Sequence, residues 1–457
     1  MDAKLPDIAV AEQLARPIAA LDPGKLPAAM RARCEETLID VVGLCLAARN
    51  EDYVRSTLQA CDDDGRCTAI GHIRTLGAAG AALVNGTAAH GEDFDDTFEG
   101  GPVHAGAVIV PAVLAACERY GRHGADALAG MAVGIEVMCR LGLVAPKMVH
   151  KAGFHPTAVF GAMGAAAAVG RALRLDAKQI TDAFGIAGSM ASGIIEYLAE
   201  GTSTKRMHAG WSAQSGLRAA LMARAGFSGP RTVFEGVHGF FHGFANTLPD
   251  NFSMLTDGFG VRFVAQALAF KLYPCGTMTH PYIDCARRLG ARGIKADDVV
   301  EMVCDVGEGT VHRLWEPLAG KQTPKIGYAG KFSTPYCVAA GFIRGNVGLS
   351  DFTDAAVHEP AVVALAGKVR YRIDPANPYP NNFTGHIRAT LRDGRVIEER
   401  QPHMRGGANE PLSRADIEDK FLLNARHGGY DAARAQAALK AAAHVLEEPV
   451  NLSVLRG

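Results

Sequence analysis

The character of the 457-residue sequence changes twice along its length, and these changes constrain the fold. The first 266 residues are rich in Ala, Leu, Met and Gly and fall into apolar segments of helical length, separated by Gly, Pro and Asp. Strand-like alternation is scarce there. Gly161, Gly164, Ala165 and Ala168 would form a stripe of small residues on one helix face, which favours close helix packing. This part predicts a compact helical domain.

A different pattern begins after Lys271. Three segments rich in β-branched residues follow at 299–307, 368–374 and 386–400. The last contains Asp393-Gly394, which is typical of the two-residue turn of a hairpin. Residues 335–345 between them have a helical pattern, so this part predicts an α+β domain.

Near the C-terminus the pattern becomes helical again. Ser413, with Asp416 three residues later, forms a capping box, and an Ala-rich helical pattern continues to about Leu446. We therefore predict two domains, a large all-α helical domain and a smaller inserted α+β lid domain. The predicted ranges are 1–266 for the first part of the helical domain, 267–408 for the lid, and 409–457 for the segment that returns to the helical domain.

Charge and cysteine content exclude several classes of function. Lys and Arg number 47 against 48 for Asp and Glu, so no overall field favours nucleic acid or an anionic membrane. The ten cysteines form no CxxC pair, which is typical of reduced core residues. The N-terminus lacks the apolar run of a signal peptide, and the longest uncharged stretch, 152–170, is a poor membrane span. We predict a soluble, cytoplasmic protein.

The segment HGEDFDDTFEGGPVHAG, residues 90–106, places five carboxylates among the eight positions from Glu92 to Glu99. If the preceding helix continued that far, His90, Asp93 and Thr97 would share one face. Crowded carboxylates raise one another's pKa, which prepares one of them as a general acid or base. A Mg²⁺ site is an alternative, and for Glu92 and Glu99 we favour a solvated loop.

Four further positions could serve the same chemistry. His104 lies in a glycine-rich loop, and His155 precedes Pro156, which is well placed as the first residue of a helix. A histidine at such a helix start stays neutral, which suits a base, although simple capping is the alternative. Lys205 and Arg206 lie in a polar loop that enters another helix.

Lys271 lies in an apolar setting, with His280 nine residues later. On the residues alone, Lys271 is expected to extend its ammonium group to the surface. Two lysines together with neutral histidines would nevertheless bind a polycarboxylate and stabilise the enolate-like anion that forms when its α-proton is removed.

Seven segments, in this order and spacing, resemble the 2-methylcitrate dehydratase family (MmgE/PrpD), which also includes cis-aconitate decarboxylase and iminodisuccinate epimerase. They are HGEDFDDT, HAGAVIVPA, FHPTAVFGAMGAA, TKRMHAG, KLYPCGTMTH, KFSTPYCVAAGFIRG and PLSRADIEDKF. The resemblance covers nearly the whole chain. It implies a helical domain with an inserted lid, a homodimer, and a cofactor-free active site in a cleft between the domains.

The resemblance also implies which residues form the site. Its positions fall on Asp93, Thr97, His104, His155, Lys205, Lys271 and Tyr336. Two departures limit the transfer. The segment from Thr97 to His104 contains FEGGPV followed by HAG, which implies a different substrate shape, and Gly276 stands where the decarboxylase branch carries a histidine. The second departure argues against cis-aconitate decarboxylation.

We therefore predict a lyase of the dehydratase type that acts on a small di- or tricarboxylate by α-proton abstraction, without cofactor or metal. The predicted catalytic residues are Asp93, His104, His155, Lys205 and Lys271, and the predicted substrate-binding residues are Thr97, Tyr336, His90, Arg206 and His280. A racemase or epimerase of an amino- or imino-dicarboxylate is a close alternative. More distant alternatives are a Mg²⁺-dependent diphosphate enzyme in which EDFDD holds the metal, and a binding protein without catalysis. The metal alternative needs a second acidic cluster, and CDDDG at 61–65 is typical of a loop.

Overall fold

The computed structural model describes residues 6–101, 103–200 and 202–457. It divides the chain into two compact units, each described here by itself. The first comprises Met1–Gly91, Asp95–Leu268 and Ser413–Gly457, and the second comprises Glu92–Phe94 and Ala269–Leu412. The N-terminal residues 1–5, on which the absence of a signal peptide was judged, lie outside the described residues, as do Pro102 of the FEGGPV segment and Gly201.

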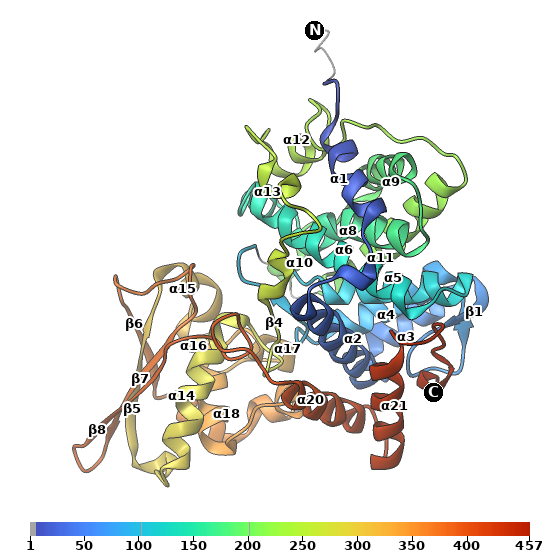
Figure 1. The fold of residues 1–457 in the computed structure, drawn as a ribbon. Helices are drawn as coiled ribbons and strands as arrows, with labels where there is room; N and C mark the ends of the chain where they lie inside the picture. Colours follow the sequence, from blue (N-terminus) through green and yellow to red (C-terminus); the bar gives the residue numbers. More distant parts are fainter. Residues whose placement is uncertain (1–5, 102, 201) are drawn as a thin grey trace. The chain divides into compact units, whose positions relative to one another are not determined.

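The first unit is helical, as its composition predicted (Figure 1). Its helices are α1 Val10–Ala20, α2 Ala28–Ala48, α3 Asp52–Ala60, α4 Ala78–Gly91, α5 Gly106–Tyr120, α6 Gly124–Val144, α7 Met148–Lys151, α8 Pro156–Ala172, α9 Ala177–Met190, α10 Tyr197–Glu200, α11 Thr204–Arg224, α12 Phe240–Ala245, α13 Ser253–Thr256, α20 Arg414–His427 and α21 Ala432–His444. Short strands are β1 Asp64–Thr68, β2 Thr75–Leu76 and β3 Thr97–Phe98, and β4 Leu268–Ala269 lies where the first unit gives way to the second.

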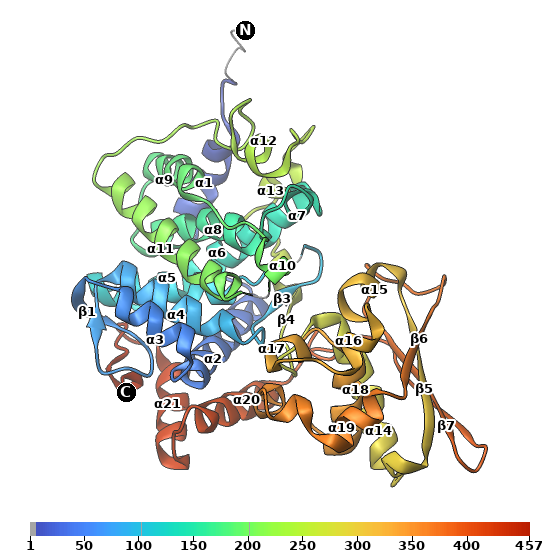
Figure 2. The ribbon, with the colours of Figure 1, turned by 180° about the vertical axis from the view of Figure 1, so that it is seen from behind.

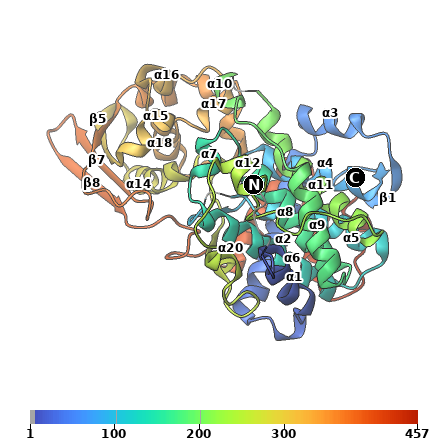
Figure 3. The same ribbon diagram turned by 90° about the horizontal axis from the view of Figure 1, so that it is seen from above.

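Small residues let the central helices of this unit approach closely. Helix α8 packs against α5, α6, α9 and α11, and α1 and α9 lie beside it when the unit is viewed from above (Figure 3). An added Cβ atom at Gly161 would lie 2.6 Å from Ser212 Oγ, and one at Gly164 would lie 2.4 Å from Met138 Cγ. The crossing of α4 and α11 is equally tight, because a Cβ at Gly86 would lie 2.6 Å from the backbone of Gly210. The predicted stripe of small residues is therefore a packing surface.

The second unit contains a four-stranded sheet with helices on one face (Figure 2). The strands are β5 Val299–Val306, β6 Val369–Ile373, β7 Gly385–Leu391 and β8 Val396–Gln401, in the spatial order β6-β5-β7-β8. Only β5 and β6 of these neighbours run parallel. The helices are α14 His280–Ala291, α15 Glu308–Leu314, α16 Leu318–Gln322, α17 Gly327–Gly330, α18 Thr334–Arg344 and α19 Pro360–Ala366. Helices α14 and α18 pack on the sheet around a core that contains Trp315 and Tyr336.

Two local predictions need correction. The hairpin between β7 and β8 turns through three residues rather than two, since the N–H of Leu391 donates to the Arg395 carbonyl and Gly394 adopts a positive φ of 87°. The helical segment after Ser413 is interrupted at residues 428–431, where two glycines end α20 and Asp431 caps α21. The capping box of Ser413 and Asp416 is confirmed.

Among the described residues, one helix is long and apolar enough to cross a membrane. This helix is α6, and 89% of its most apolar window is buried inside the protein. Such burial is typical of a core helix. Its inward-facing Glu136 and Arg140 form an ion pair at 2.6 Å and bind the backbone of residues 254–265, which fixes the segment that leads toward the second unit in the sequence.

Candidate active site

The acidic segment does not continue helix α4, so the prediction that His90, Asp93 and Thr97 share a helix face is wrong. The helix ends at Gly91, where a Cβ atom would lie 2.2 Å from the ring of Tyr53. Asp93 has a positive φ of 55°, which a helix cannot accommodate, and Thr97 lies in β3. Carboxylates at a helix C-terminus oppose the helix dipole, which explains why the chain leaves the helix here.

Four histidines meet in the first unit. The ring centroid of His90 lies 4.9 Å from that of His104 and 5.6 Å from that of His155, and the last two are 6.3 Å apart. His208 joins them, because its Nδ1 atom lies 3.1 Å from His155 Nδ1. The edge of the Tyr197 ring faces both His155 and His208. These five side chains come from α4, the loop before α5, the start of α8, α10 and α11. We call His90, His104, His155 and His208 the histidine cluster.

Two adjacent aspartates support this cluster from the loop after α4. Asp95 is fully buried, and its Oδ2 atom lies 2.6 Å from His90 Nδ1. The backbone carbonyl of Asp96 lies 2.6 Å from His104 Nδ1, and its side-chain Oδ1 accepts a hydrogen bond from the N–H of Gly106, the first residue of α5. Burial and the neighbouring charge of Asp95 raise the pKa of Asp96 to about 8. Asp96 is therefore mostly protonated at neutral pH, and it holds the loop against α5.

The helix start at His155 was predicted correctly. His155 is the N-cap of α8 and Pro156 is the first helical residue. Burial lowers the pKa of His155 well below its usual value, and the charges of His90 and Lys205 lower it further. The same causes lower the pKa of His208 to about 4. Both rings are consequently neutral at physiological pH, as the helix start had suggested for His155, although burial rather than the helix terminus is the main cause.

Three other predicted site residues, Lys205, Arg206 and Thr97, also lie in the first unit. Lys205 lies in the first turn of α11 rather than in a loop, where its charge acts on His155 and His208. The guanidinium of Arg206 stacks over the ring of Tyr53, in the first turn of α3, at 4.6 Å from the ring centroid. Thr97 is buried in β3.

In the second unit, two buried lysines bind the residues that open the acidic segment. Lys271 Nζ donates to both the carbonyl and the Oδ1 atom of Asp93, at 2.9 and 2.8 Å. Lys331 Nζ binds Glu92 in the same way, at 2.7 Å to the carbonyl and 2.6 Å to Oε2. Each lysine is about 1% exposed. The expectation that Lys271 extends to the surface is therefore wrong, as is the solvated loop at Glu92, because each charge is paired inside the protein.

The structure places Tyr336 and His280 inside the core of the second unit. The hydroxyl of Tyr336 donates to the carbonyl of Asp351, and burial raises the pKa of this phenol above its usual value. His280 opens α14 with its ring edge against Tyr273, at 5.2 Å between centroids. Beside it lies Cys275, where burial opposes ionisation of the thiol, but a hydrogen bond with Cys337 and the charges of His280 and Lys271 prevail and lower its pKa to about 6.

The predicted site did not include four residues that contribute to the histidine cluster or to the buried lysine pairs. Asp95 and Glu92 were visible only as parts of a charge run, and nothing in the spacing distinguished them from Asp93. His208 could have been found, because it stands three residues after Lys205 and so shares a face of α11 with it. Lys331 opens the KFSTPY string, and its partner Glu92 is 239 positions away, which no local pattern reveals.

Three residues of this region have the chemistry of metal ligands. Ligand atoms of His90, Asp95 and His104 lie within 4.8 Å of one another, so these residues could hold a divalent ion. The Nδ1 atoms of both histidines already face the oxygens of Asp95 and Asp96 at 2.6 Å. The two other carboxylates of EDFDD are already paired, Glu92 with Lys331 and Asp93 with Lys271. This pairing weakens the Mg²⁺ alternative.

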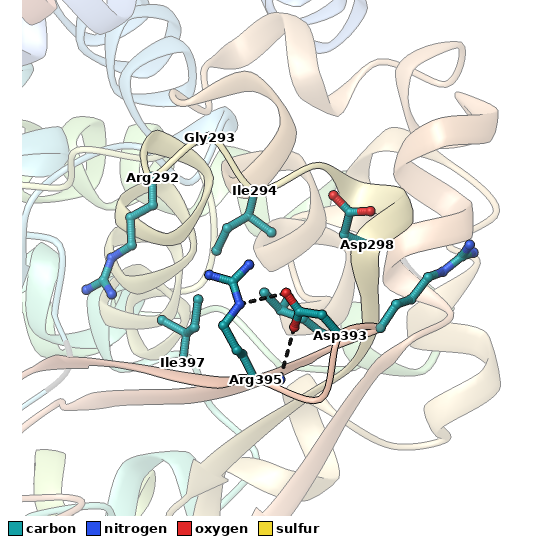
Figure 4. Close-up of a pocket in the computed structure, with 9 residues that line it drawn as sticks. Arg292, Gly293, Ile294, Asp298, Asp393, Arg395 and Ile397 are labelled. Atoms are coloured by element: carbon teal, nitrogen blue, oxygen red, sulfur yellow. Dashed lines mark hydrogen bonds and ion pairs between the residues drawn. The ribbon is translucent and has the colours of Figure 1, made fainter.

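Two cavities among the described residues lie elsewhere. A cavity of about 720 Å³ in the first unit is bounded by α9, α11 and the end of α3, and it is lined by side chains that include Trp211, Gln214 and Arg218. A cavity of about 530 Å³ in the second unit lies at the β7–β8 hairpin (Figure 4). Two of its arginines pair with carboxylates of the unit, since Arg395 binds Asp393 and Arg292 binds Glu399. Neither cavity is lined by a predicted site residue.

Comparison with known proteins defines the class. The sequence profile of the MmgE/PrpD N-terminal domain matches residues 12–252, and that of the C-terminal domain matches residues 273–445. The chain therefore belongs to the MmgE/PrpD family, as its seven segments indicated.

Its relatives within the family include several lyases. It is 31% identical to human cis-aconitate decarboxylase over 364 residues, which cover 76% of this chain and 72% of the relative. It is 26% identical to the cis-aconitate decarboxylase of Aspergillus terreus over 396 residues, 81% of this chain and 79% of the relative. A cis-aconitate decarboxylase-like protein of Aspergillus oryzae is 27% identical over 442 residues, 91% and 90% of the two chains.

The raised pKa of Asp96 predicts how stability depends on pH. The folded protein binds this proton more tightly than the unfolded chain, whose carboxyl has a pKa near 3.8. The resulting stabilisation is complete below that value and is lost as the pH rises through about 8. The side chain of Asp96→Asn cannot ionise. The Tm of this variant should therefore rise relative to the Tm of the wild type as the pH is raised from 5 to 9.

Thermal unfolding followed by circular dichroism at several pH values measures this difference. Asp250→Asn, at an exposed loop position, is the matched control and should keep a constant offset from the wild type. An Asp96→Asn Tm that runs parallel to that of the wild type from pH 5 to pH 9 would show that Asp96 is ionised in the folded protein.

Proposed function

We propose that this protein is a cofactor-independent lyase that removes an α-proton from a small di- or tricarboxylate and expels water. One observation supports this most strongly. The acidic segment after α4 supplies partners to two sets of catalytic groups, because Asp95 binds the histidine cluster and Asp93 binds Lys271. Neutral imidazoles suit proton abstraction, and a buried ammonium suits stabilisation of the developing aci-carboxylate anion.

The roles follow from the charge state of each group. His155 is neutral and would take the α-proton, and His104 would protonate the departing hydroxide. Lys205 and Lys271 would bind the carboxylates of the substrate. Asp93, which the sequence suggested as a base, is bound by Lys271 and would neutralise this lysine until a substrate carboxylate replaces it. Thr97 would orient the substrate, whereas the hydroxyl of Tyr336 is engaged by the Asp351 carbonyl in the core of the second unit.

An epimerase or racemase would use the same groups without elimination. Such an enzyme removes a proton from one face of a carbon and returns it to the other, which requires an acid/base group on each side. The imidazoles of His104 and His155, whose ring centroids lie 6.3 Å apart, keep this alternative open.

Decarboxylation is a second candidate, because the relatives named above are cis-aconitate decarboxylases. The position at which the resemblance expects a decarboxylase histidine is occupied by Gly276. Its N–H donates to the Lys331 carbonyl at 2.9 Å, and a Cβ atom there would lie 3.2 Å from Leu314 Cδ2. No imidazole can act from this position, which favours water elimination over loss of carbon dioxide.

A substrate panel in D₂O tests the proposal. We expect one of 2-methylcitrate, citrate, the aconitate isomers, malate or amino-dicarboxylates to gain or lose a C=C bond, seen by ultraviolet absorbance. Proton NMR should show deuterium at the α-carbon. Activity should persist in EDTA, because the proposed chemistry uses side chains alone. Deuterium uptake without a new double bond would show an epimerase, carbon dioxide release from cis-aconitate would show a decarboxylase, and loss of activity in EDTA would contradict the proposal.

Lys271 provides a test that separates catalysis from stability. Lys271→Met leaves the buried Asp93 carboxylate without its ammonium partner and should cost roughly 3–5 kcal/mol of stability. The double variant Asp93→Asn/Lys271→Met removes both charges and should recover most of that loss. Turnover should stay at least roughly 100-fold below the wild type in both variants, because neither can stabilise the developing anion.

Chemical denaturation and steady-state rates of the two variants measure these effects. Recovery of turnover along with stability in the double variant would show that Lys271 has a purely structural role.

A further inference from the structure

The buried carboxylate of Asp95 faces two histidines at once. Its Oδ2 atom lies 2.6 Å from His90 Nδ1, and its Oδ1 atom lies 3.5 Å from His104 Nδ1. All three side chains lie in the first unit, and Asp95 and His90 are each at most 1% exposed. The resemblance to the family assigned no role to Asp95.

The acceptors around these rings determine where their protons reside. The backbone carbonyl of Asp96, 2.6 Å from His104 Nδ1, can only accept a hydrogen bond, so this nitrogen carries a proton. An ionised carboxylate is likewise only an acceptor, so His90 Nδ1 carries a proton toward Asp95. In both rings Nε2 is then the nitrogen that can gain or lose a proton during a reaction. His90 Nε2 is buried and has no hydrogen-bond partner among the described residues.

We propose that Asp95 is a positioning residue that holds His90 and His104 in their Nδ1–H forms and stabilises the positive charge of protonated His104. This inference rests on the proposed elimination. In that reaction the C–O bond breaks with its electron pair on oxygen, and the proton on His104 Nε2 passes to that oxygen to give water. His104 becomes a neutral ring with its proton on Nδ1, while Asp95 remains a carboxylate throughout.

Of the charged groups near His90 and His104, Asp95 is the one suited to stabilise a positive charge on His104. Asp96 is mostly protonated near neutral pH, while His155 and His208 are neutral and Lys205 is positive. Lys205 and any second protonated imidazole would repel a proton on His104. The carboxylate of Asp95 offsets that repulsion at 3.5 Å in a buried setting, where charge interactions are strong.

The adjacent aspartate provides a matched control. Both side chains are fully buried in the same loop, yet only the side chain of Asp95 faces the two rings. The contact of Asp96 with His104 uses the backbone carbonyl, which substitution preserves. Asp96→Asn also resembles the protonated form that prevails at neutral pH.

The experiment compares Asp95→Asn with Asp96→Asn on the substrate found by the panel. We expect kcat of Asp95→Asn to fall roughly 100-fold or more with little change in KM, because orienting carboxylates act on the reacting step. Its activity should decline at a lower pH on the alkaline side, since an amide cannot stabilise the imidazolium. Asp96→Asn should keep kcat within about threefold at pH 7. Equal losses in the two variants, or an unshifted pH profile in Asp95→Asn, would overturn the inference.

A measurement without substrate keeps the two proposals separable. In ¹⁵N-histidine-labelled protein, His90 should show a protonated Nδ1 with a strongly downfield proton, which Asp95→Asn removes and Asp96→Asn retains. An unprotonated Nδ1 on His90 or His104 in the wild type would overturn the inference. If no compound of the panel reacts, the proposed elimination fails, while the NMR spectra still decide whether Asp95 fixes these rings.

Discussion

The structure depends on how it neutralises the buried negative charges that follow helix α4. A carboxylate removed from water without a partner costs several kcal/mol, and this segment buries Asp93, Asp95 and Asp96 almost completely. The structure solves this problem differently for each residue. Asp93 binds an ammonium group, Asp95 binds an imidazole, and Asp96 retains a proton. Most of the chemistry proposed here follows from the first two of these partners.

These partners also explain why so acidic a segment lies in an almost neutral protein. The segment is shared between the two units, because Glu92–Phe94 pack with the second and the residues from Asp95 pack with the first. Lysines from the second unit bind the first two carboxylates through both side chain and backbone. Histidines of the first unit meet the next carboxylate. The acidic groups of this segment thus have partners inside the protein, two ammonium groups and an imidazole, and do not depend on exposure to solvent.

Features fixed by local patterns were predictable from the sequence, and those fixed by long-range pairing were not. The mainly helical first part, the β-rich second part, the N-cap at His155 and the capping box at Ser413 follow from neighbouring residues alone. The close approach of Gly91 to the ring of Tyr53 and the burial of Lys271 against Asp93, 178 positions away, depend instead on residues that are distant in the sequence. Extending the helical period past Gly91 therefore led to the wrong partner for His90.

The proposed chemistry requires that burial and neighbouring charge keep the imidazoles of His155 and His208 neutral, so that they can exchange protons with a substrate. The most direct measurement is a pH titration of their ring nitrogens by ¹⁵N NMR, assigned with His155→Gln and His208→Gln. The account predicts that both rings remain neutral from pH 8 down to pH 5, since the pKa of each lies well below 6.5. Titration of either ring near pH 6.5 would contradict it.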